Sequence, residues 1–176
     1  MTYTMEDFRN DYADCKAQLE NLGYHLQDNI PLVFNNRAVT RYGQCTVYRN
    51  NCTGESKVRK IELSTKPFAY SSREEIKNTV MHECIHALPE CHFVGHKGNW
   101  VRIANEVNNK YGYNISRCSS REDKEGLAQA KAQVTRYIVK CEKCGHEWNY
   151  QKFSNCVKHP EHYTHNKCGG HLVRVK

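Results

Sequence analysis

The stretch EEIKNTVMHECIHA, residues 74–87, decides the fold of the first part of this 176-residue chain. A helix is expected from about residue 73 to 87, because Ser72 and Glu75 have the spacing of a capping box at its start. Pro89 disfavours helical geometry at the residue before it and so predicts the end of the helix. One side of the helix is apolar and is expected to be buried: Ile76, Val80, Cys84, Ala87 and Leu88.

The other side of the helix has an H-E-x-x-H motif formed by His82, Glu83 and His86. Positions four apart differ by only about 40° around a helix, so the two imidazoles can bind one ion. Zinc held by neutral histidines lowers the pKa of its bound water, and an adjacent carboxylate can pass the proton to a leaving amine. The motif predicts peptide-bond hydrolysis, with His82 and His86 as zinc ligands and Glu83 as the general base.

A catalytic zinc needs a third protein ligand and an open fourth position, and two histidines compete for this role. His92 stands where the metzincin pattern H-E-x-x-H-x-x-G-x-x-H has its third ligand, but Pro89 replaces the glycine of that pattern and cannot adopt a positive φ. His96 lies at the start of a second predicted helix, residues 97–111, and a short loop can bring it back over the first. His96 is preferred, and His92 remains the alternative.

The remaining elements before residue 120 predict a mixture of helix and strand. An amphipathic helix is expected over residues 5–22, where apolar residues have helical spacing and Gly23 follows. Short strands are expected at 30–34, 44–49 and 57–63, and the turn-rich segment between the last two indicates a small antiparallel sheet.

The ten cysteines and the charge distribution indicate metal ligation and a polyanionic partner. No run approaches the roughly 18 apolar residues of a membrane span, and the charged first 16 residues are not typical of a signal peptide. We therefore expect a cytoplasmic protein with reduced thiols and no membrane partner. The net charge is +7, and residues 121–176 carry 11 basic against 6 acidic side chains, which fits either a polyanionic partner or ordinary solubility.

The C-terminal segment has two knuckles of metal-ligand spacing, Cys141 with Cys144 and His165 with Cys168. Two such pairs are typical of a closed, tetrahedral structural zinc. A redox C-x-x-C is disfavoured because no βαβ pattern surrounds the motif. Three residues between the knuckles remain alternative ligands: Cys156, His159 and His162.

Aromatic and basic residues alternate in the same segment. Four lysines are expected to contact nucleic acid through its phosphates: Lys143, Lys152, Lys158 and Lys167. Four rings could stack on bases, but in so short a module they are more often its core: Trp148, Tyr150, Phe153 and Tyr163. The lysines therefore support nucleic-acid binding better than the rings do.

Five segments together resemble the SprT-like zinc metallopeptidases, which are related to the Spartan proteases that degrade proteins crosslinked to DNA. They are NRAVTRYGQC, IELST, EEIKNTVMHECIHA, GHKGNW and RYIVKCEKCG. The likeness is closest to the small SprT-like proteins of bacteria and phages, which implies a location in the cytoplasm, or in the host cytoplasm for a phage protein. It also implies His82, His86 and His96 as ligands of a catalytic zinc, Glu83 as the general base, and a second, structural zinc in a C-terminal ribbon. The extra His92 departs from the family pattern.

The expected architecture is α+β: a zincin-like domain with a small antiparallel sheet and an H-E-x-x-H helix, followed by a zinc ribbon. The predicted parts are a SprT-like metallopeptidase domain at 1–120, a helical linker at 121–135 and the ribbon at 136–176. The expected function is zinc-dependent endopeptidase activity on proteins that are associated with DNA. A nucleic-acid-binding adaptor without turnover and a small-peptide hydrolase remain open, although an adaptor has no need of Glu83.

Overall fold

The computed structural model describes residues 3–116 and 121–176, which form two compact units, Met1–Ala128 and Gln129–Lys176. The division between the units falls inside helix α5, Arg121–Val134. The domain boundary that the sequence predicts at residue 120 lies outside the described residues.

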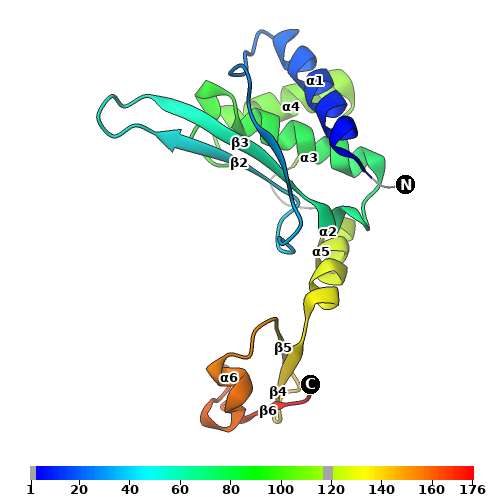
Figure 1. Ribbon diagram of the computed structural model, residues 1–176, viewed down its shortest axis with the longest axis vertical. Helices are drawn as coiled ribbons and strands as arrows, with labels where there is room; N and C mark the ends of the chain where they lie inside the picture. The colour runs from blue at the N-terminus through cyan, green and yellow to red at the C-terminus, as the bar shows by residue number, and fades with distance from the viewer. Residues whose placement is uncertain (1–2, 117–120) are drawn as a thin grey trace. The chain divides into compact units, whose positions relative to one another are not determined.

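The first unit has a three-stranded sheet in the order β1-β3-β2 (Figure 1). Its strands are β1 Leu32–Asn35, β2 Gly43–Arg49 and β3 Ser56–Ser64. β2 pairs antiparallel with β3, as predicted, but β1 pairs parallel with β3, so the prediction of an antiparallel sheet is wrong for β1. The reason is that β3 lies between the other two strands. The chain reverses direction twice from β1 to β3, and the first and third strands therefore run the same way.

Three helices cover one face of this sheet, as Figure 1 shows. They are α1 Met5–Glu20, α3 Arg73–His86 and α4 Asn99–Tyr111; the short elements α2 Thr65–Phe68 and η1 Pro89–Cys91 flank α3. The capping box predicted from Ser72 and Glu75 is present at the start of α3. None of the helices within the described ranges is long and apolar enough to cross a membrane.

The core of the first unit lies between the helices and the sheet. Its largest fully buried side chains come from all three helices and from β3: Phe8, Leu19, Ile61, Leu63, Met81, Ile85, Trp100, Ile103 and Val107. The predicted apolar side of α3 is also buried, from Ile76 to Leu88. Burial of this side fixes α3 against the sheet, while His82 and His86 on its other side keep partial exposure.

The second unit is a small antiparallel sheet with irregular connections. Its strands are β4 Tyr137–Cys141, β5 Glu147–Tyr150 and β6 Leu172–Arg174, in the order β5-β4-β6. The chain between β5 and β6 contains α6 Asn155–Lys158 and η2 Pro160–His162. The core has only four buried residues, Val139, Cys141, Val157 and Leu172, so this unit has little apolar burial to hold it together.

Candidate active site and metal centres

Three histidines from two parts of the first unit converge on one point. His82 and His86 come from α3, and His96 comes from the segment between η1 and α4. The Nε2 atom of His96 lies 2.9 Å from Nε2 of His82 and 3.1 Å from Nε2 of His86. A tetrahedral zinc with Zn–N bonds of about 2.0–2.1 Å holds its nitrogen ligands about 3.3 Å apart. The three ligand nitrogens all lie within 4.8 Å of one another and are therefore close enough to bind one zinc ion.

Trp100 is the common neighbour of these three rings. This side chain belongs to the first turn of α4 and is 2% exposed. Its ring centroid lies 4.8 Å from that of His82, 5.3 Å from that of His86 and 4.6 Å from that of His96. In the sequence, Trp100 is the last residue of the segment GHKGNW, which contributes to the resemblance. The structure shows that it also restricts the orientation of all three imidazoles.

The histidines of α3 are neutral at physiological pH. Burial lowers the pKa of His82 to about 3, with a further contribution from the charges of His86 and His96. Burial and the charge of His96 lower the pKa of His86 to about 4. A neutral imidazole has a free lone pair, so both side chains are in the form that binds a metal.

His92 does not join this group. Its Nδ1 atom lies 2.7 Å from the Ser56 hydroxyl, and its Nε2 atom lies 3.2 Å from the Ala87 carbonyl oxygen. Both ring nitrogens therefore have partners within the protein. Of the two alternatives, the structure brings His96 to His82 and His86, and places His92 against the end of α3.

Glu83 is buried beside the histidines and contacts the edge strand β2. Glu83 is only 6% exposed, and its Oε2 atom accepts a hydrogen bond of 2.6 Å from the Cys45 backbone N–H. Burial raises the pKa of Glu83 to about 8, although the Cys45 N–H and the positive charge of Arg41 oppose the rise. A divalent cation bound by the histidines would act in the same direction as Arg41 and favour the ionised carboxylate.

Gly43 makes room for the Glu83 side chain. A Cβ atom at position 43 would lie 2.8 Å from both Cγ and Oε1 of Glu83, which is closer than van der Waals contact allows. Sequence reasoning did not identify Gly43 or Cys45, because strand pairing and helix packing bring them to Glu83 across a separation of about 40 residues. They appeared only as letters of the segment NRAVTRYGQC.

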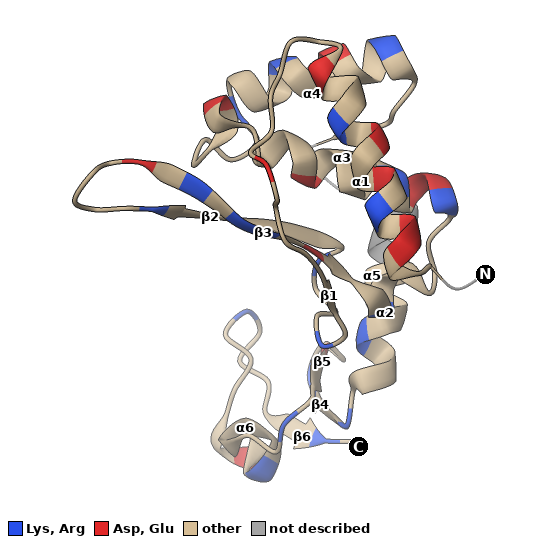
Figure 2. Ribbon diagram, turned by 45° about the horizontal axis from the view of Figure 1, so that its top comes forward, with Lys and Arg blue, Asp and Glu red and all other residues tan. Residues whose placement is uncertain are grey.

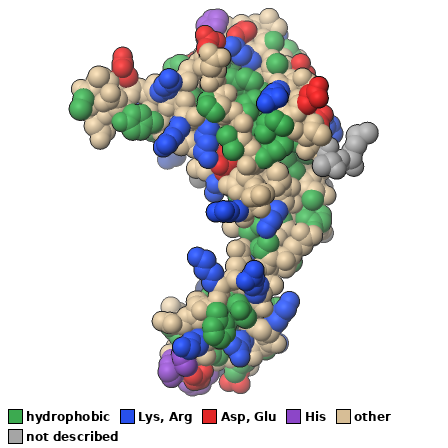
Figure 3. Space-filling model, viewed as in Figure 1, with side chains coloured by type: hydrophobic (Ala, Val, Ile, Leu, Met, Phe, Trp, Pro, Cys, Tyr) green, Lys and Arg blue, Asp and Glu red, His purple; other side chains and the backbone are tan. Residues whose placement is uncertain are grey.

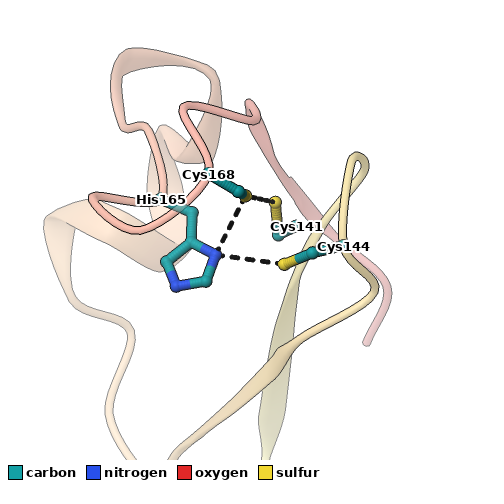
Figure 4. A group of neighbouring side chains, drawn as sticks. All are labelled: Cys141, Cys144, His165 and Cys168. Carbon is teal, nitrogen blue, oxygen red and sulfur yellow. Dashed lines mark hydrogen bonds between the residues drawn. The ribbon is translucent and has the colours of Figure 1, made fainter.

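The second unit brings together the four ligands that its knuckles predict (Figure 4). The Cys141 and Cys168 sulfurs are 3.5 Å apart, and Nδ1 of His165 lies 3.1 Å from the Cys144 sulfur and 3.2 Å from the Cys168 sulfur. Three sulfurs and one nitrogen in a compact group suit a closed tetrahedral zinc site. Gly170 belongs to this packing, because a Cβ there would lie 2.6 Å from the Cys141 sulfur.

The three alternative ligands lie outside this group of four. The Cys156 sulfur accepts a hydrogen bond from the Tyr150 hydroxyl at 3.4 Å and packs against the ribbon core. His159 and His162 form a separate exposed group with Glu161. The structure therefore brings His165, and none of the three alternatives, to the cysteines.

The lysines and aromatic rings of the ribbon divide between surface and core. Lys143, Lys152, Lys158 and Lys167 are all exposed. Two of the rings, Trp148 and Tyr150, pack against the core, whereas Phe153 is 53% exposed and Tyr163 is 40% exposed. Figure 3 shows Lys and Arg side chains over the ribbon surface, around exposed hydrophobic side chains.

In a comparison with protein-family models, residues 11–119 match the SprT-like family. This segment is more than half of the chain and contains all the candidate active-site residues of the first unit. The chain belongs to the SprT-like family. As a member of this family, the SprT-like protein is metallopeptidase-like. The three-histidine group of its first unit and the Cys and His group of its second are consistent with zinc. A search of curated proteins found no match.

Proposed function

We propose that this SprT-like protein is a zinc-dependent endopeptidase. The observation that carries the proposal is the convergence of the His82, His86 and His96 nitrogens beside the buried carboxylate of Glu83. Three histidine nitrogens leave one coordination position open, which is typical of a catalytic zinc. His92, with both ring nitrogens in contact with other groups, is the weaker candidate for the third ligand.

The chemistry follows from the position of Glu83. Zinc bound by the histidines would polarise the substrate carbonyl and make a water molecule more acidic. Glu83 acts as the general base: its carboxylate takes a proton from the attacking water and delivers it to the nitrogen of the leaving amine. The hydrogen bond from the Cys45 N–H holds Oε2 in place, and the absence of a side chain at Gly43 leaves space for the carboxylate.

The topology also supports an extended substrate. β2 is an edge strand in the order β1-β3-β2, so its outer backbone groups pair with no other strand of residues 3–116 and 121–176. An extended peptide can pair with such an edge and lie across the adjacent helix that contains Glu83. A site of this kind accepts the middle of a chain, which suits an endopeptidase better than a hydrolase of small peptides.

We also propose that the substrates are proteins associated with DNA and that the ribbon binds a structural zinc through Cys141, Cys144, His165 and Cys168. Residues 136–176 contain eight Lys or Arg and three Glu side chains. The exposure of Lys143, Lys152, Lys158 and Lys167 supports phosphate contacts that do not depend on base sequence. A zinc site of four ligands would hold these lysines on a defined surface.

The test compares wild type with Glu83→Gln, using Glu74→Gln in the exposed first turn of the same helix as a matched control. Zinc content and cleavage of a disordered basic protein are measured, with and without single-stranded DNA. Glu83→Gln should keep its zinc and lose roughly 100-fold or more in kcat, because only the proton-transfer group is removed. Cleavage by Glu83→Gln equal to that by Glu74→Gln would refute the role of Glu83 as general base. No cleavage by wild type would favour the adaptor.

A further inference from the structure

The face of the sheet in the first unit that the helices leave uncovered is strongly basic. Val47, Val58 and Ile61 pack on the face that the helices cover, and side chains alternate between the two faces of a strand. A register shift between Thr46 and Val47 adds one residue to β3, which lets Val58 and Ile61 face the same side. The cross-strand pairs Tyr48 with Lys57 and Thr46 with Lys60 therefore lie on the opposite, open face. Figure 2 shows Lys and Arg positions along β3.

The one acidic residue on the open face of these two strands is already neutralised. Glu62 is 5% exposed and accepts hydrogen bonds from Asn35 at 2.7 Å and from Arg41 at 2.9 Å, as well as from Lys60. Lys57 and Arg59, by contrast, are exposed and make no ion pair with any described residue. Two cations on β3 are therefore free to bind an external anion.

These two cations line a cavity of about 630 Å³ between β2, β3 and residues 27–31. The Tyr48 ring also lines the cavity and is 60% exposed, and amide side chains come from Gln27 and Asn29. Asp28 is the acidic residue among the lining side chains, and its carboxylate lies 3.1 Å from the Lys16 ammonium, which offsets its charge. The cavity thus combines a flat aromatic surface with two uncompensated positive charges.

We propose that this cavity binds single-stranded nucleic acid, with phosphates on Lys57 and Arg59 and a base stacked on Tyr48. Proteins that bind single strands combine aromatic rings with a positively charged groove. A base must leave its stack to lie against the exposed face of Tyr48, so a single strand fits the site and a duplex does not. The site lies in the first unit and is separate from the ribbon lysines of the proposed function.

The test uses the full chain and a fluorescent oligothymidylate, with binding measured by anisotropy over a salt series. The variant K57E/R59E is compared with R9E/K110E, which changes the charge equally at exposed positions on α1 and α4. K57E/R59E should bind about tenfold or more weakly, and its salt slope should fall by about 1.4, because two phosphate contacts are lost. The control should bind nearly as wild type does.

A second pair of variants tests the ring. Tyr48→Ala should weaken oligothymidylate binding about tenfold, whereas Tyr48→Phe, which keeps the stacking surface, should bind within about twofold of wild type. If the charge reversal disturbs folding, the neutral variant K57Q/R59Q replaces it. This variant should also bind oligothymidylate more weakly than wild type, with a smaller loss of affinity than the reversal causes.

Binding by K57E/R59E or K57Q/R59Q that equals wild type would overturn the proposal. Competition by an acidic peptide as strong as by unlabelled oligothymidylate would also overturn it, because the occupant would then be a peptide. Zinc content and DNA-independent cleavage of a disordered protein should stay unchanged in K57E/R59E. A wild type that binds the oligothymidylate at this site but cleaves nothing would refute the peptidase and leave this proposal standing.

Discussion

The two units differ in how much buried core lies beneath their candidate zinc ligands. The first unit has a core cluster of 22 buried residues among those described, and two of its histidines stand on a helix that packs into this core. The second unit has a core cluster of four buried residues, and its four candidate ligands lie in or next to turns. We therefore expect the first unit to form its site before zinc binds, and the second to need zinc in order to fold.

Removal of a ribbon ligand should give the largest effect. Cys144→Ser should unfold the second unit and leave the first folded, because a structural zinc contributes on the order of 10 kcal/mol to so small a module. Hydrogen exchange read by mass spectrometry would show lost protection after Ala128 only. Cys52→Ser, at an exposed cysteine outside both groups, is the matched control. If the residues after Ala128 kept their protection from hydrogen exchange in Cys144→Ser, the two units would not differ in their need for zinc.

Removal of a candidate ligand in the first unit should affect zinc but not the fold. His96→Ala should lower zinc from about two ions per chain to about one, because two nitrogens hold zinc much less tightly than three. His92→Ala should keep both ions, since its ring nitrogens contact Ser56 and Ala87. Metal analysis of both variants decides between the histidines, and greater zinc loss in His92→Ala would restore the metzincin-like alternative.

Filling the space beside Glu83 should have a smaller effect. Gly43→Ala should reduce kcat roughly 10- to 100-fold while zinc content stays unchanged, because the added methyl group displaces the carboxylate that handles the proton. Gln44→Ala, at the next, exposed position, serves as control. An increase in KM with unchanged kcat would instead place position 43 in substrate binding.

The smallest effect concerns acid stability of the first unit. Burial alone would raise the pKa of Glu62, but hydrogen bonds from Lys60, Asn35 and Arg41 outweigh it and lower the pKa from 4.5 to about 2. The ionised form therefore stabilises the fold above pH 4.5, and this contribution is lost as the pH falls toward 2. Glu62→Gln should remove about 1 kcal/mol of this pH dependence, discounted because Lys60 and Arg41 are partly exposed.

Urea unfolding of wild type and Glu62→Gln between pH 6 and pH 2 measures this difference. The two stability curves should converge as the pH approaches 2. Curves that stay parallel over the whole range would show that Glu62 makes no ionised contribution, and would place the acid sensitivity of the unit elsewhere.

The sequence by itself determined the features that depend on neighbours along the chain. The capping box of Ser72 and Glu75 and the four-residue spacing of His82 and His86 follow from helix geometry, and the Cys141 and Cys144 spacing follows from a single turn. Such features need only contacts between residues a few positions apart. Together with the other segments that resemble the SprT-like proteins, they predicted the family, which the SprT-like match confirms.

Only the tertiary structure decided which distant groups meet. It brings His96 rather than His92 to the two helix histidines, joins Glu83 to Cys45, and pairs β1 parallel with β3. Each of these contacts closes a loop of the chain. Which residues meet depends on how the buried helices and strands pack, and not on spacing along the chain. The open basic face of β3 has the same origin, because strand register alone determines which cations lie away from the core.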